Sequence, residues 1–211
     1  MGALYKWCLV LVLGGASGLA QAVNADIEAR FKQVMADIQA RQKAEKAGKR
    51  AAFFCENCHG ETGNSPLPNV PNLAGQNPVY LLNQIEKFGD GRRNDQFMSG
   101  LVKVLKPEER FQMSVFYAGQ KVVPTPAKDA RLAQVGRDHY QRACRGCHGA
   151  DARGSKEVAR LAGQRGDYLV TALKGYRTGQ GTRSDPTMTS IARKLDERQI
   201  QALSVYLASL P

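Results

Sequence analysis

The chain has 211 residues, of which 43% are hydrophobic and 7% aromatic, a length that suits one larger domain or two small ones. Its formal net charge of +11 makes it strongly basic, which suits an acidic docking face on another protein or an anionic membrane surface. We expect no nucleic-acid partner, because the sequence lacks a motif that interleaves basic and aromatic residues.

The first 25 residues are typical of a signal peptide. Lys6 is the only charged residue before Asp26, and an apolar stretch begins at Trp7. Residues 20–22, Ala-Gln-Ala, form a candidate cleavage site. The apolar stretch is short for a membrane span. The sequence therefore predicts export to the periplasm, with retention as a membrane tether on the periplasmic side as the alternative.

Residues 26–46 are expected to form a charged amphipathic helix, with Ile27, Phe31, Val34 and Ile38 on one face. This N-terminal helical extension has no counterpart elsewhere in the chain. It can pack on the helices that follow it, or it can serve as a docking or membrane-surface element. We expect the packing role.

The rest of the chain contains an internal repeat, with matching residues about 90 positions apart, as in duplicated domains. Leu73 matches Leu161, and Gly91 matches Gly181. Two closely spaced prolines in the segment 122–128 stop the preceding helix and predict a short, stiff linker. We therefore expect two domains, at residues 47–121 and 129–211.

Each half is expected to be helical, because apolar residues recur at helical spacing and no segment shows a sustained alternation typical of strands. The fold class is predicted to be all-α. The expected helices lie at 44–54, 78–88, 107–118, 130–143, 167–176 and 196–209.

Each half contains one Cys-x-x-Cys-His sequence, the attachment signature of a c-type haem. Two thiols at this spacing can form thioethers with the two vinyl groups of a porphyrin, and the next residue directs an imidazole at the iron. We therefore expect two covalently attached haem c groups with their iron. The expected attachment residues and proximal iron ligands are Cys55, Cys58 and His59, and Cys144, Cys147 and His148.

Other uses of the cysteines remain open but fit less well. The two pairs are much farther apart in sequence than those of a zinc ribbon. A thioredoxin-like redox pair needs a strand–helix context, which is not predicted here. Two structural disulfides would suit an exported protein. None of these sites requires a histidine after each cysteine pair.

The ligand on the opposite face of each iron separates an electron carrier from a catalyst. Met98 and Met188 stand at matching positions in polar segments, where we expect loops, and each is expected to ligate iron through its thioether. His139 has no partner in the first half, and Met113 matches Leu203 on a terminal helix, where a core role is expected. A His/Met pair leaves both irons six-coordinate, which suits electron transfer.

From about Gly48 to its C-terminus, the chain resembles the di-haem cytochrome c4 family, built from two class I cytochrome c domains. The resemblance rests on the two Cys-x-x-Cys-His-Gly sequences, on Pro-Asn-Leu-Ala-Gly-Gln at 71–76, on the Met98 segment and on their equivalents. Gly136 matches the glycine that lets the terminal helices of class I domains cross, whereas Gly48 stands one position off that spacing.

The resemblance also implies how the proximal histidines are held. The carbonyl of Pro71 would accept a hydrogen bond from His59. The second half departs from this pattern with Ala159, whose carbonyl could still serve His148. The two haem pockets would face each other near the linker.

The function implied by the resemblance is one-electron carriage in the periplasm, from a quinol-oxidising cytochrome bc complex to a terminal oxidase. Docking through a basic face, and association with a membrane surface, would follow from the positive charge. We expect no enzyme activity. The alternatives are a di-haem peroxidase, a thiosulfate-oxidising cytochrome, or a cytochrome subunit docked permanently on a larger enzyme.

Overall fold

The computed structural model describes the backbone of residues 15–211 and the side chains of residues 26–211. Within this range every regular element is a helix, so the predicted all-α class is confirmed. The expected signal peptide at residues 1–25 lies outside the part of the chain whose side chains are described. No helix among the described residues is long and apolar enough to cross a membrane.

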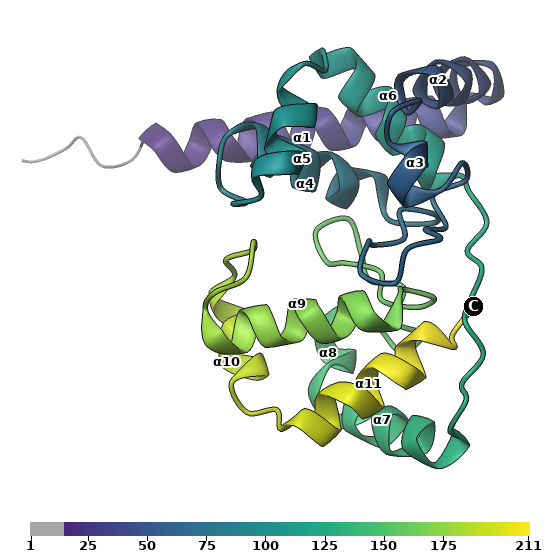
Figure 1. Cartoon of the computed structure of the whole chain (residues 1–211). Helices are drawn as coiled ribbons and strands as arrows, with labels where there is room; N and C mark the ends of the chain where they lie inside the picture. The colour runs from purple at the N-terminus through teal and green to yellow at the C-terminus, as the bar shows by residue number, and fades with distance from the viewer. Residues whose placement is uncertain (1–14) are drawn as a thin grey trace, which may run out of the picture.

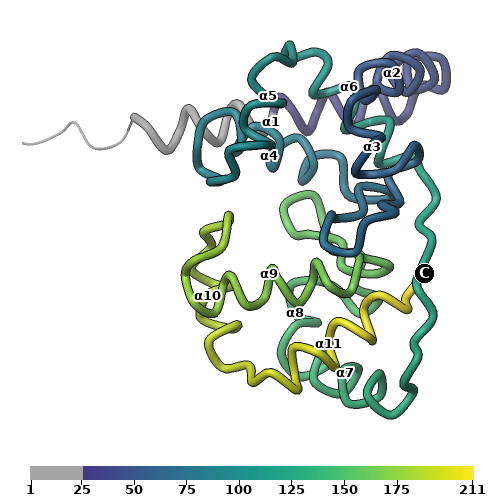
Figure 2. Tube along the Cα trace, viewed as in Figure 1, coloured from purple at the N-terminus to yellow at the C-terminus, as the bar shows by residue number. Residues whose placement is uncertain are grey.

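The helices form two groups, one above the other in Figure 1, which we call the first and second halves. An extended segment after α6 runs along one side and joins them, and the C-terminus ends beside it (Figures 1 and 2). The first half contains α1 (Gly15–Ala36), α2 (Ile38–Ala51), α3 (Glu56–His59), α4 (Pro78–Gly89), α5 (Gln96–Lys103) and α6 (Pro107–Ala118). The second half contains α7 (Ala130–Ala143), α8 (Arg145–His148), α9 (Gly166–Thr178), α10 (Pro186–Ala192) and α11 (Glu197–Ala208).

Each half is built around one close helix crossing, α2 on α6 and α7 on α11. Glycine makes both crossings possible. A Cβ atom on Gly48 would lie 2.1 Å from the carbonyl oxygen of Gln112, and one on Gly136 would lie 2.0 Å from that of Ala202. The backbones therefore approach to a distance that excludes any side chain, and Gly48 fills the same role as Gly136 despite its offset in sequence.

The N-terminal extension contains a helix break that the amphipathic pattern did not predict. α1 ends at Ala36, and the carboxylate of Asp37 caps α2 by accepting hydrogen bonds from the backbone N–H groups of Gln39 (2.8 Å) and Ala40 (3.1 Å). The expected single helix at 26–46 is therefore two helices, and α2 continues past residue 46 to Ala51. Because the chain turns at Asp37, Ile38 is 66% exposed instead of joining the apolar face.

The apolar face of α1 packs on the first half. Phe31 is buried and stacks on Phe111 of α6 with ring centroids 4.4 Å apart, and Ile27 and Val34 pack against the same cluster. Glu28 of α1 also forms an ion pair with Lys156 of the second half at 2.6 Å. These contacts support the packing role expected for the extension.

Candidate functional site

The two Cys-x-x-Cys-His sequences adopt the same local structure. In each, the first cysteine precedes a single helical turn, α3 or α8, that ends at the histidine. A glycine with positive φ follows each turn, Gly60 at 79° and Gly149 at 85°, and lets the chain leave in a direction other residues rarely adopt. Residues at i, i+3 and i+4 share one helical face, so the two thiols and the imidazole of each motif lie together.

The two imidazoles are buried and held by backbone carbonyls. Nδ1 of His59 lies 2.9 Å from the oxygen of Pro71, and Nδ1 of His148 lies 2.9 Å from the oxygen of Ala159. A carbonyl only accepts, so Nδ1 carries the proton in both rings and Nε2 is left with its lone pair for a metal. Burial lowers the pKa of both rings, which favours the neutral form that ligates iron. Both contacts implied by the resemblance are present.

The four thiols of the motifs form no disulfide with one another. Burial raises the pKa of the Cys55 and Cys144 thiols to about 11 each. A reactive redox pair depends on a lowered thiol pKa, so this environment is the opposite of a thioredoxin-like site. The thiols are instead unbridged and belong to the same short motif as a buried imidazole.

The two methionines are held by equal helix caps. The carboxylate of Asp95 accepts a hydrogen bond from the N–H of Met98 (3.0 Å), and that of Asp185 does the same for Met188 (2.9 Å). Each methionine therefore lies in the first turn of a short helix, α5 or α10, and not in the expected loop. Met113, the alternative considered in the first half, is 4% exposed in the core, as predicted.

Two arginines that the sequence pattern did not single out lie at matching positions near the methionine segments. Arg93 is buried, donates to the side-chain oxygen of Gln84 at 3.1 Å and lies over the ring of Phe88. Its Nε has no hydrogen-bond partner, and burial lowers its pKa to about 10. Arg183 donates to the hydroxyls of Tyr80 and Tyr168. Neither arginine forms an ion pair with a carboxylate within residues 26–211, although the segment Gly-x-Arg recurs in both halves and could have marked them.

These residues fit a c-type haem in each half. Each half supplies two unbridged thiols, a buried imidazole with a free Nε2 and a capped methionine. The unsatisfied buried Nε of Arg93 is complementary to a carboxylate such as a haem propionate. The donor set therefore suits a ring-shaped cofactor that carries both an iron and acidic groups.

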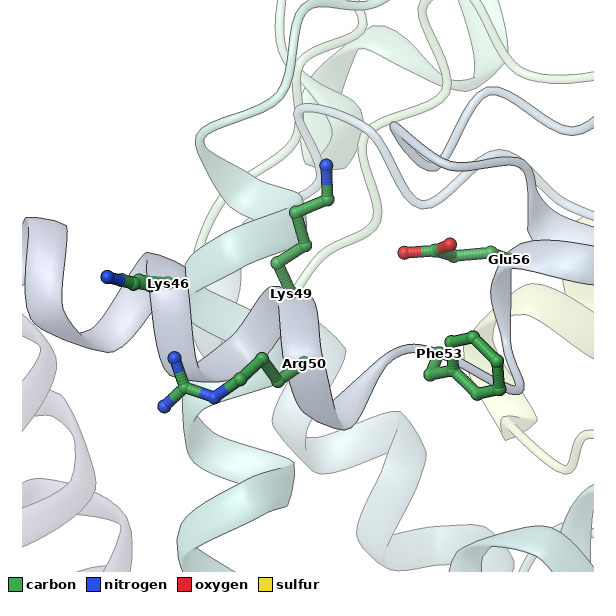
Figure 3. Close-up of a pocket in the computed structure, with 5 residues that line it drawn as sticks. All are labelled: Lys46, Lys49, Arg50, Phe53 and Glu56. Atoms are coloured by element: carbon green, nitrogen blue, oxygen red, sulfur yellow. The ribbon is translucent and has the colours of Figure 1, made fainter.

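A shallow basic depression lies beside the first motif (Figure 3). Lys46, Lys49 and Arg50 extend from the C-terminal part of α2, and Phe53 and Glu56 line its other side. Phe53 is 66% exposed. Lys49 is paired with Glu61 at 2.7 Å, whereas exposed aromatic and arginine side chains such as Phe53 and Arg50 are enriched at protein interfaces.

A family model described as Cytochrome c matches residues 133–211. Cytochrome c4 of Pseudomonas aeruginosa is 35% identical over 78% of this chain and 87% of its own length. A thiosulfate dehydrogenase electron acceptor of Thiomonas intermedia is 32% identical over 76% of this chain and 80% of its own.

A crystal structure of reduced recombinant cytochrome c4 from Pseudomonas stutzeri matches with a TM-score of 0.72 and 30% identity, over 79% of this chain and 98% of that one. The fold is therefore that of tandem cytochrome c domains related by duplication. The family model and these relatives imply covalently bound c-type haem with its iron. The chain belongs to the cytochrome c4 family of electron-transfer haem proteins.

Proposed function

We propose that the chain carries two haem c groups, one in each of two domains at residues 47–121 and 129–211 that are joined by a linker at 122–128, and that it moves electrons one at a time. The observation that carries this proposal is the equality of the two sites, each with a carbonyl-held imidazole and a capped methionine. The proposed attachment residues are Cys55, Cys58, Cys144 and Cys147, and the proposed axial ligands are His59, Met98, His148 and Met188.

The haem iron, when bound, supplies a one-electron couple between its ferric and ferrous states. The residues of the chain would hold the iron and set its surroundings. Pro71 and Ala159 fix the planes of the two imidazoles through their carbonyls. The soft thioethers of Met98 and Met188 would favour the ferrous state, and the burial of His59 and His148 would limit the access of water to a bound iron.

An electron carrier fits this arrangement better than an enzyme. Catalysis at a haem needs an open or weakly held position on the iron. In the proposed arrangement each haem would have an equivalent methionine, Met98 or Met188, and both methionines are held by the same kind of helix cap. We therefore propose no peroxidase or thiosulfate-oxidising activity for this chain itself.

Cytochrome c4 homologues are periplasmic c-type cytochromes. For this chain we propose export directed by residues 1–25, with a retained membrane tether as the alternative. The proposed partners are a quinol-oxidising cytochrome bc complex as donor and a terminal oxidase as acceptor. The depression lined by Lys46, Lys49, Arg50 and Phe53 would meet an acidic face on such a partner.

A second donor is suggested by the relative from Thiomonas intermedia, which is named as an electron acceptor of thiosulfate dehydrogenase. An enzyme of that class would deliver electrons one at a time to the same haems. The two donors are distinguished by stopped-flow reduction of this protein, first by a reduced cytochrome bc complex and then by a thiosulfate dehydrogenase with its substrate. The faster reaction at physiological salt identifies the donor.

The central experiment is an optical redox titration of protein purified from a host that attaches haem c. We expect two covalent low-spin haems, each with a weak ferric band near the red end that marks thioether ligation, and each with a positive potential. A single covalent haem, or a high-spin haem in the native protein, would contradict the proposal.

A further inference from the structure

Two buried glutamines at matching positions reach across between the halves. Gln164 accepts a hydrogen bond at Oε1 from the N–H of Asn72 (2.6 Å) and donates from Nε2 to the oxygen of Asn72 (3.0 Å). Gln76 does the same with Arg160, accepting at 2.7 Å and donating at 2.9 Å. Gln76 and Gln164 are 6% and 8% exposed, so little water competes for these bonds.

Each glutamine binds a peptide unit that also holds a proximal histidine. The N–H of Asn72 and the carbonyl of Pro71 belong to one peptide bond, and that carbonyl accepts from Nδ1 of His59. A chain of hydrogen bonds, which we call a relay, thus runs from the imidazole of His59, through this peptide, to Gln164 of the second half. The peptide between Ala159 and Arg160 connects His148 to Gln76 in the same way.

Such a relay has an electronic consequence. When a peptide N–H donates a hydrogen bond, its own amide is polarised, and the carbonyl oxygen of that amide becomes a stronger acceptor. A stronger acceptor at Nδ1 makes an iron-bound imidazole more basic and stabilises ferric iron. Removing a glutamine from one half should therefore favour ferrous iron in the other half.

We propose that Gln164 is a positioning residue for His59 and Gln76 is one for His148, so that each half sets part of the reduction potential of the haem in the other. The inference rests on the proposed function in one respect, the ligation of iron by these two histidines. It assigns to the contact between the halves a role in redox tuning as well as in assembly.

The linker holds this contact in register. Gly75 and Gly163, which precede the two glutamines, have positive φ values of 62° and 68°. A Cβ atom on Gly75 would lie 2.5 Å from one methyl group of Val122, and one on Gly163 would lie 2.2 Å from the other. Val122 therefore packs between the two glycines and fixes the backbone from which each glutamine side chain extends.

The test uses the full-length protein with both haems and the variants Gln164→Leu and Gln76→Leu. The matched control is Gln120→Leu, because the Gln120 amide donates to the oxygen of Phe116 within one half (2.9 Å). Haem methyl resonances followed by NMR through a redox titration report each haem separately, once the Met98→Ala and Met188→Ala proteins have assigned them.

For Gln164→Leu we expect a crossed effect. The ferrous-to-ferric ratio of the His59 haem at a fixed potential should rise on the order of threefold, which is about 28 mV at 59 mV per tenfold. The His148 haem should stay unchanged, and Gln76→Leu should give the reverse pattern. Amide hydrogen exchange should quicken at Asn72 in the first variant and at Arg160 in the second.

Several outcomes would overturn the inference. A shift of both haems by either variant means that the interface has merely loosened, and a shift confined to the substituted half, or no shift beyond that of Gln120→Leu, removes the relay. If Gln164→Leu fails to fold, Gln164→Asn keeps an amide that is one carbon too short and should shift the same haem. Failure of the proposed function is distinct, because the unsubstituted protein would then lack two six-coordinate haems.

Discussion

The two halves hold equivalent sites in unequal surroundings. The His59 carbonyl acceptor is Pro71, whereas that of His148 is Ala159, yet both contacts measure 2.9 Å. A backbone carbonyl can be offered by any residue, so the site survives the loss of the proline. The first half has in addition a helix, α1, that covers part of its core through Phe31. The site therefore requires a backbone carbonyl near each histidine, whereas α1 supports the core of the first half.

The largest effect is expected from removing either methionine. Met98→Ala or Met188→Ala should open one iron to carbon monoxide and lower the potential of that haem by on the order of 100 mV, while the other haem is unchanged. Carbon monoxide difference spectra and redox titration measure both. Met113→Leu, a conservative change in the core, should leave both haems closed. Ligand binding by neither variant would refute thioether ligation.

The second effect concerns the support unique to the first half. Phe31→Ala removes a buried ring stacked on Phe111 and should reduce the free energy of unfolding by about 3 kcal/mol. Thermal unfolding followed at each haem should show the loss in the first half. The nearby control Ile38→Ala alters a side chain that is 66% exposed and should change stability by less than about 0.5 kcal/mol. Equal changes in the two variants would mean that α1 does not stabilise the core.

The third effect should be the same in both halves. Gly48→Ala and Gly136→Ala each place a Cβ against a backbone carbonyl across a helix crossing and should destabilise the protein by about 1–3 kcal/mol. Gly100→Ala is the control, because a Cβ there meets nothing within 4 Å. Denaturant unfolding measures all three variants. A large difference between the first two would show that the crossings are not equivalent.

The smallest effect is expected when the first half is made to match the second. Pro71→Ala should keep the hydrogen bond from His59 and leave the potential of its haem nearly unchanged, since the acceptor is the carbonyl. Stability should fall by about 0.4–1 kcal/mol, because the unfolded chain gains freedom. Redox titration and thermal unfolding test this pair of expectations. A marked fall in potential would mean that the proline ring itself shapes the site.

The sequence predicted those features that depend on local spacing. The helices expected at 107–118 and 130–143 begin and end where predicted, and the one-turn motifs place Cys55 and His59 as the spacing requires. The break at Asp37 and the helical turns at Met98 and Met188 were not predicted. Each of the three helices that begin there, α2, α5 and α10, has an aspartate as its N-terminal cap. Apolar periodicity does not register such caps.

Features that depend on contact between the halves could not be predicted. Gln76 and Gln164 stand at matching places in the repeated Leu-Ala-Gly-Gln segment, but nothing in that segment indicates that their side chains reach across between the halves. Their burial arises only when segments about ninety residues apart meet, and no local pattern encodes that meeting.

The exchange of the same glutamine contact in both directions has a consequence for assembly. A surface that binds its own copy in this way is what two identical subunits use around a two-fold axis. The contact between the halves thus has the geometry of a homodimer interface inside one polypeptide, and the short linker makes the encounter of the halves intramolecular and independent of concentration. A polypeptide with only one half would instead have to associate with a second copy to bring two such sites together.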